Sequence, residues 1–177
     1  MSNTIVIYKS KYGNAEQYAK WLAAELDADI AECSPQAFAD IEKYDTVIYG
    51  GSMYAVGILG FDLFKENFDR IAARKIVVFT VGASPAWEEA VNEVRETNFP
   101  QEMRDKIMHV HLRGGFDFKG LNFVDRALMT LLKLKIKCKP ESKRTPDERG
   151  MLGSYSGSHD WKQKSAIQPI LEYVRRN

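Results

Sequence analysis

The stretch Thr4–Ala15, which reads TIVIYKSKYGNA, joins three patterns that together decide the fold. Its first part, Thr4–Tyr8, is a short apolar run rich in β-branched residues, which is typical of a strand buried on both faces. Lys9–Asn14 then supplies a hydroxyl, a glycine and polar residues, and from Ala15 onward apolar residues recur with helical spacing. The stretch therefore predicts a strand, a loop and an amphipathic helix, in that order.

The same order of patterns recurs along the chain. Other apolar runs predict strands, the weakest of them first, at Asp29–Cys33, Thr46–Tyr49, Lys75–Val81 and Ile107–Leu112. Helical spacing predicts helices over Ala15–Leu26, Phe61–Ile71, Trp87–Val94 and Ala166–Val174. Pro169 should kink the last helix or delay its start, because proline has no backbone N–H to donate. The alternation predicts a doubly wound α/β fold, a parallel sheet with helices on both faces.

Doubly wound sheets bind ligands beyond the carboxyl ends of their strands, so the loops after Tyr8, Tyr49 and Val81 form the candidate site. In the loop after Tyr8, N–H groups at the start of the helix lack intrahelical partners and can enclose a phosphate. The loop has neither a GxxxxGK[ST] nor a GxGxxG pattern, so a lone monophosphate fits it better than a magnesium-bound nucleotide or a dinucleotide. The alternative is that Ser10 or Asn14 only caps the helix.

The two later loops also combine small residues with an aromatic residue. Gly50–Gly57 reads GGSMYAVG, in which two glycines permit close backbone approach and Tyr54 offers a flat apolar surface. Gly82–Trp87 reads GASPAW. A planar ring fits between these two loops. The alternative for Tyr54 and Trp87 is ordinary packing against the rest of the protein.

The distribution of charge limits the classes of partner. The chain has 177 residues and a formal net charge of +1, which argues against a disordered acidic chain and against a uniformly basic protein. Residues 1–105 hold 10 basic and 17 acidic residues, whereas residues 106–177 hold 15 basic and 7 acidic residues. An anionic ligand or surface should therefore meet the later part. Because the basic residues lack aromatic stacking motifs, we expect no nucleic-acid partner.

The cysteines and the amino-terminal residues bear on the compartment. Cys33 and Cys138 form no CxxC pair and have no neighbouring ligands at metal-site spacing, which argues against a disulfide framework or a structural metal. Met1–Thr4 leads straight into an apolar run without the pattern of a secretory leader, and no run of about 18 apolar residues occurs. We expect a cytoplasmic protein.

The loops resemble those of the flavodoxin-like family, which binds flavin mononucleotide (FMN). The resemblance spans nearly the whole chain and rests on Tyr8–Ala15 with Ala19, Gly50-Gly51-Ser52 and Phe79-Thr80-Val81. It is closest to the branch containing the menaquinone-dependent protoporphyrinogen oxidase, on the basis of Gly114-Gly115-Phe116, Val124-Asp125-Arg126 and Asp160-Trp161. It implies one flavodoxin-like domain over residues 1–177, with a five-stranded parallel sheet in the order 2-1-3-4-5.

The resemblance also implies the residues that hold the cofactor, without a metal. The flavin phosphate would be held by Ser10, Lys11, Tyr12, Gly13, Asn14 and Ala15. One side of the isoalloxazine ring would be flanked by Ser52, Met53, Tyr54 and Ala55, and another lined by Gly82, Ala83 and Ser84. Electron-carrier flavodoxins usually have a threonine at the position of Tyr12 and a second hydroxyl at that of Ala15. Phosphate binding should therefore rest more on backbone amides here.

The segment 116–159, before the last helix, is expected to be an apolar and basic insertion with a long loop. Lys133–Lys139 alternates every second residue and fits a strand or a helix. Residues 123–139 could contact an anionic membrane surface as a peripheral site at the inner face, or form the entrance for a quinone or a tetrapyrrole carboxylate. The alternative is that Leu128, Leu131 and Leu132 cover the sheet edge while the lysines are solvated. Lys139–His159 is polar and should be a long, lid-like loop.

Three functions remain open from the sequence. The first is an FMN-dependent oxidoreductase, similar to protoporphyrinogen oxidase, that acts on a quinone, a tetrapyrrole or another conjugated substrate. The second is an electron-transfer protein that serves a redox partner protein, which the near-neutral charge disfavours because carriers of this family are typically acidic. The third is a binding domain without flavin. His109 and His111 should share one face of a strand, and neither indicates an acid or base.

Overall fold

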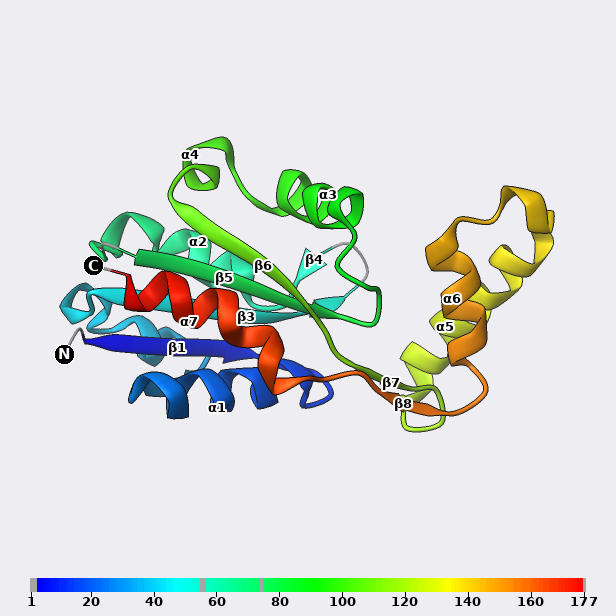
Figure 1. Ribbon diagram of the computed structural model, residues 1–177, viewed down its shortest axis with the longest axis horizontal. Coiled ribbons are helices and arrows are strands. Elements are labelled where there is room, and N and C mark those ends of the chain that lie inside the picture. Colours follow the sequence, from blue (N-terminus) through cyan, green and yellow to red (C-terminus); the bar gives the residue numbers. More distant parts are fainter. Residues whose placement is uncertain (1–2, 55–56, 74, 177) are drawn as a thin grey trace.

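The computed structural model describes residues 3–54, 57–73 and 75–176. Its main sheet has the strand order β2-β1-β3-β5-β6, and each neighbouring pair is parallel (Figure 1). The strands are β1 (Thr4–Lys9), β2 (Asp29–Glu32), β3 (Thr46–Tyr54), β5 (Lys75–Gly82) and β6 (Ile107–Arg113). A short strand, β4 (Gly57–Ile58), pairs antiparallel with the end of β3. The predicted α/β fold and strand order are confirmed.

Both faces of the central strands are buried, which explains their continuous apolar sequences. Ile5 and Ile7 of β1 pack on the face covered by α2 (Phe61–Glu66), α3 (Glu88–Asn98) and α4 (Gln101–Arg104). Val6, between them, packs on the opposite face against α1 (Asn14–Leu26) and α7 (Gln168–Arg175). The alternation of side chains along a strand thus gives each helical layer its own half of the core.

Short 3₁₀ helices complete this part of the chain. Between β2 and β3 lie η1 (Pro35–Phe38) and η2 (Ile41–Lys43), and η3 (Phe68–Arg70) follows α2. Before α7 comes η5 (Lys164–Ile167), and Pro169 lies in the first turn of α7. A first-turn residue has no intrahelical acceptor for its N–H, so proline is tolerated there. Of the two outcomes expected at Pro169, the structure has the late start.

An insertion, residues 115–160, follows β6 and lies beyond the ends of β5 and β6 (Figure 1). Its stem is the antiparallel pair β7 (Gly115–Asp117) and β8 (Ser158–Asp160), and it carries α5 (Phe123–Cys138), η4 (Glu141–Lys143) and α6 (Pro146–Ser154). Leu128 and Leu131 are 51% and 63% exposed, so the expectation that they cover the sheet edge is wrong. Across the described ranges, no helix combines the length and apolar character needed to span a bilayer.

The long loop expected over Lys139–His159 is also wrong, because much of this polar segment is helical. Thr145 caps α6: its hydroxyl accepts a hydrogen bond from Glu148 N at 3.1 Å, and Glu148 Oε2 accepts one from Thr145 N at 2.9 Å. With Pro146 in the first turn, the sequence TPDE is a helix start signal. The polar composition concealed it.

The ambiguous stretch Lys133–Lys139 is helical as far as Cys138, where α5 ends. The guanidinium of Arg144 donates to three carbonyls at that end, those of Ile136, Lys137 and Lys139, at 3.1 Å each. Ile136 O also accepts a hydrogen bond from Lys139 N, whereas carbonyls at the end of a helix generally lack intrahelical partners, so a cation from the following segment stabilises this end of α5.

Gly50 and Gly51, predicted to start the second loop, lie within β3 and serve the packing of the protein core. A Cβ at Gly50 would lie 1.9 Å from Phe79 Cζ, and one at Gly51 would lie 2.3 Å from Ile58 Cγ2. Phe79 is fully buried, so it has little room to move. The close approach that these glycines permit is therefore that of apolar side chains of this chain.

We predict that Gly50→Ala lowers the free energy of unfolding of the protein by about 1–3 kcal/mol, because the added methyl group overpacks the site next to Phe79. Urea denaturation measures this change. Gly150→Ala is the control, since its Cβ would meet nothing within 4 Å in α6, and there alanine should stabilise the helix by about 0.5–1 kcal/mol. Equal unfolding midpoints for the Gly50 variant and the wild type would contradict the packing argument.

Candidate cofactor site

The loop between β1 and α1 presents an open helix start. Gly13 is the N-cap residue of α1, with a φ of 78°, and no side chain caps the helix. The first helical hydrogen bond runs from Gln17 N to Gly13 O, so the amides of Asn14 and Ala15 precede it and have no intrahelical acceptor. The left-handed conformation at Gly13 favours glycine. The alternative in which Ser10 or Asn14 caps the helix is wrong.

Ser10 provides a second indication of a ligand. Its Oγ is buried and has no hydrogen-bond partner among the described residues. A buried hydroxyl without a partner is costly, and a phosphate oxygen next to the free amides of α1 would remove that cost. The residues present therefore fit the phosphate of FMN.

The side chain of Asn14 holds the insertion. Its Nδ2 donates to Gly115 O at 3.1 Å, and its Oδ1 accepts from Gly115 N at 2.9 Å and from Lys162 Nζ at 3.1 Å. This pairing with Gly115 resembles the exchange of two hydrogen bonds between neighbouring strands. The Oδ1 of Asn14 thus binds the insertion and Lys162, and the backbone amide of Asn14 is available to contact a phosphate.

Lys11, Tyr12 and Tyr54, three of the residues assigned to the cofactor, meet at Asp125. The carboxylate of Asp125 accepts hydrogen bonds from Lys11 Nζ at 2.9 Å, from Tyr54 OH at 2.8 Å and from Tyr12 OH. Asp125 lies in the first turn of α5 and is only 5% exposed. The hydrogen bonds from Lys11 and Tyr12 lower its pKa to about 2. No local pattern marks Asp125 as a site residue, because Lys11, Tyr12 and Tyr54 lie more than 70 residues away along the chain.

Most of the predicted second loop is strand instead, because β3 continues through Tyr54, and this end of β3 lies beside the loop after β1. Ser52 is buried, and its Oγ accepts a hydrogen bond from Lys11 N at 3.4 Å. Met53 is half-buried and Tyr54 is exposed at the end of β3. Ala55, which was also assigned to the flavin ring, lies outside the described residues.

The third loop is fixed by β6. Gly114 N donates to Gly82 O at 2.7 Å, and Arg113 Nε donates to Ala83 O at 3.0 Å. The ring Nε2 of His111 lies 3.3 Å from Ser84 O. All three residues assigned to the flavin in this loop thus have backbone carbonyls held by the last strand of the sheet.

His109 and His111 share one face of β6, as expected, and both contact Thr80 of β5. Thr80 Oγ1 lies 3.0 Å from His109 Nε2 and 2.9 Å from His111 Nδ1. Burial lowers the pKa of His109 to about 4, so this imidazole is neutral at pH 7. Burial also lowers the pKa of His111, so both imidazoles support the third loop as neutral side chains.

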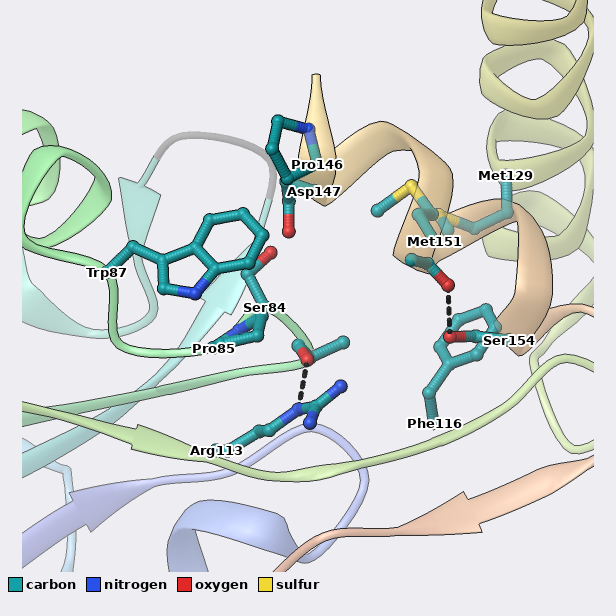
Figure 2. Close-up of a pocket in the computed structure, with 12 residues that line it drawn as sticks. Ser84, Pro85, Trp87, Arg113, Phe116, Met129, Pro146, Asp147, Met151 and Ser154 are labelled. Atoms are coloured by element: carbon teal, nitrogen blue, oxygen red, sulfur yellow. Dashed lines mark hydrogen bonds between the residues drawn. The ribbon is translucent and has the colours of Figure 1, made fainter. Parts of the chain in front are cut away.

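A pocket of about 100 Å³ separates the third loop from the insertion (Figure 2). The sheet side contributes Trp87 and Arg113, and the insertion contributes Phe116, Met129, Asp147 and Met151. The guanidinium of Arg113 also lies 4.0 Å from the centre of the Trp161 ring. Sequence patterns mark only Trp87 and the motifs that contain Phe116 and Trp161. The other residues carry no signal, because the pocket forms only where the insertion returns to the sheet.

The flavodoxin domain model matches residues 5–143, which is most of the chain. No curated protein matches the chain.

Three solved structures illustrate the likeness in fold. A flavoprotein from Lactobacillus acidophilus in complex with FMN is 13% identical, covers 64% of this chain and 93% of its own, and has a TM-score of 0.46. Flavodoxin 2 from Bacillus cereus is 19% identical, covering 63% and 86%, with a TM-score of 0.43. The Trp repressor binding protein from Bacillus subtilis is 15% identical, covering 63% and 85%, with a TM-score of 0.49.

We predict that Ser10→Ala weakens FMN binding without destabilising the FMN-free protein. FMN affinity should fall about 10-fold or more, since hydrogen bonds to charged groups contribute about 1.5–3 kcal/mol. The FMN-free protein should be as stable as the wild type or more stable, because an unpaired buried hydroxyl is removed. Quenching of flavin fluorescence measures the affinity, thermal unfolding measures the stability, and Ser165→Ala on the exposed surface is the control. Loss of stability in the FMN-free variant would indicate a structural serine and contradict the assignment.

Proposed function

We propose that this chain, which belongs to the flavodoxin domain family and has FMN as its cofactor, is an oxidoreductase acting on a quinone, a tetrapyrrole or another conjugated molecule. Bound FMN supplies reversible acceptance of electrons. The chain itself would hold the cofactor in the three loops and control which molecules approach it. A protoporphyrinogen oxidase-like activity is the specific form of this proposal.

The pocket beside the third loop carries the proposal. Trp87, Phe116 and Met151 line it with aromatic and thioether side chains, which pack well on conjugated rings, and at about 100 Å³ it would hold one edge of such a molecule rather than enclose it. Gly82–Ser84, assigned to the flavin ring, contributes two residues to the same pocket, so a molecule bound there would lie next to the cofactor loop.

Arg113 gives the pocket a cationic group. Its Nε donates to Ala83 O, while its terminal nitrogens have no acceptor within the ranges that the structure covers. A guanidinium with two free nitrogens binds a carboxylate in a bidentate manner, and it also donates to a carbonyl oxygen. Carboxylate side chains of a tetrapyrrole and the oxygens of a quinone both meet this requirement.

We predict that Arg113→Gln raises the KM for protoporphyrinogen IX about 10-fold or more, because a charge-assisted hydrogen bond to a carboxylate is lost. The assay uses FMN-loaded protein with a menaquinone analogue as electron acceptor. Arg149→Gln, an exposed arginine of α6, is the control and should leave KM unchanged. An unchanged KM in the Arg113 variant would overturn the role of the pocket. Absence of turnover with either substrate in the wild type would favour the electron-carrier alternative.

The exposed face of α5 supports contact with a membrane surface, where quinones reside. This face consists of Phe123, Val124, Leu128, Leu131 and Leu134, with exposed fractions from 51% to 86%. Lys133, Lys135 and Lys137 lie on the same helix, whose one acidic residue, Asp125, is buried. An apolar helix face next to lysines is the pattern of a helix that lies in the interface of an anionic membrane.

We predict that replacing Lys133, Lys135 and Lys137 with serine weakens binding to vesicles of phosphatidylglycerol and phosphatidylcholine. Each lysine near an anionic surface contributes about 1 kcal/mol, so the triple variant should bind about 100-fold more weakly at low salt. Co-sedimentation measures the binding, and high salt should reduce the difference. Serine at Lys20, Lys43 and Lys65, which removes the same charge elsewhere, is the matched control. Equal binding of the two triple variants would refute the membrane role of α5.

A further inference from the structure

Asp125 joins the insertion to both of the first two cofactor loops. Its carboxylate is buried in the first turn of α5, and the side chains that donate to it from outside the insertion are Lys11, Tyr12 and Tyr54. Lys11 and Tyr12 belong to the loop after β1, and Tyr54 ends β3. Asn122 Nδ2, from the N-cap of α5, donates to the same carboxylate at 3.2 Å.

We propose that Asp125 is a positioning residue that couples FMN binding to the docking of the insertion. It holds the side chains of the two loops in the arrangement that receives FMN, and the same contacts hold the start of α5 against those loops. The inference rests on the assignment of these loops to FMN. It does not depend on the identity of the substrate.

Asp125 neutralises the charge of Lys11. Its ammonium lies 2.9 Å from the carboxylate of Asp125 and 3.7 Å from the centre of the Tyr54 ring. The carboxylate therefore neutralises the nearest cation and holds it over one face of Tyr54. This leaves the phosphate to Ser10 and the backbone amides, and it leaves only the opposite face of Tyr54 for a planar ligand.

Asp125 does not contact the backbone amides at the start of α1. Its contacts with the loops are all to side chains, and among the described residues the amides of Asn14 and Ala15 have no acceptor. A carboxylate that mimicked the phosphate would accept hydrogen bonds from those amides. Asp125 thus organises the outer side of the loop without filling the phosphate position.

The contacts of Asp125 also dock the start of α5. Most of its length is exposed, and the side chains that fix its start are those around Asp125. Removing one partner of a buried charged cluster leaves the others unpaired, which is strongly destabilising. If Asp125 favours the loop arrangement that binds FMN, then FMN must favour the docked α5 by the same factor, because coupling between two binding equilibria is reciprocal.

The experiment compares wild type, Asp125→Asn and Asp117→Asn, the last being an exposed carboxylate of the same insertion. FMN affinity is measured by quenching of flavin fluorescence, and trypsin cleavage within Lys133–Lys139 is followed by mass spectrometry with and without FMN. We expect Asp125→Asn to bind FMN at least 10-fold more weakly and FMN to slow cleavage of α5 in the wild type and in Asp117→Asn only. Lys11→Met, which leaves α5 unaltered, should also abolish the protection by FMN.

Unchanged FMN binding by Asp125→Asn would overturn the proposal, because it would mean that the carboxylate has no effect on FMN binding. Tighter binding would overturn it too, because it would mean that the carboxylate competes with the phosphate for Lys11. Cleavage of α5 that ignores FMN in the wild type would overturn it as well. If Asp125→Asn fails to fold, Lys11→Met decides the matter by the same two measurements. A result that supports this coupling while Arg113→Gln leaves KM unchanged would remove only the proposed substrate pocket.

Discussion

The parallel pairing of β1, β3 and β5 is the constraint on which the rest of the structure depends. It aligns Lys9 with Gly51 and Ser52 with Val81, so that these strands end at the same edge of the sheet. The loops that follow are therefore neighbours, although they are about 40 residues apart in the chain, as the contact of Lys11 N with Ser52 Oγ shows. A cofactor that needs a phosphate cradle and a place for a flat ring finds both at one edge.

The insertion uses that same edge as its support. Asn14 pairs with Gly115 of the stem, and Asp125 of α5 receives Lys11, Tyr12 and Tyr54. The loop after β1 thus has two proposed roles: its backbone amides would hold the phosphate of FMN, while its side chains hold the insertion. The coupling that we propose follows from this sharing, because a ligand in the loop and the insertion would depend on the same few residues.

The position of the insertion also creates surfaces that the sheet lacks. Its inner side closes the pocket with Phe116 and Met151 opposite Trp87 and Arg113 (Figure 2). The outer side of α5 leaves Leu128 and Leu131 uncovered, because the helix extends away from the core. One element therefore accounts for the proposed substrate pocket and for the proposed membrane contact.

The sequence by itself determined the main strands, the helices that cover the sheet, the fold and the loop after β1, because each depends on local periodicity or on glycine and small residues at a strand end, whereas β3 continues through the predicted second loop as far as Tyr54. It failed where polar composition concealed the helix start at Thr145, and where Gly50 and Gly51 prove to accommodate Phe79 and Ile58. Only the tertiary structure decided that Asp125 lies among Lys11, Tyr12 and Tyr54 and that Arg113 faces the insertion. The physical reason is that a buried charge is stabilised by partners brought together in space, and their separation along the chain carries no periodic signal.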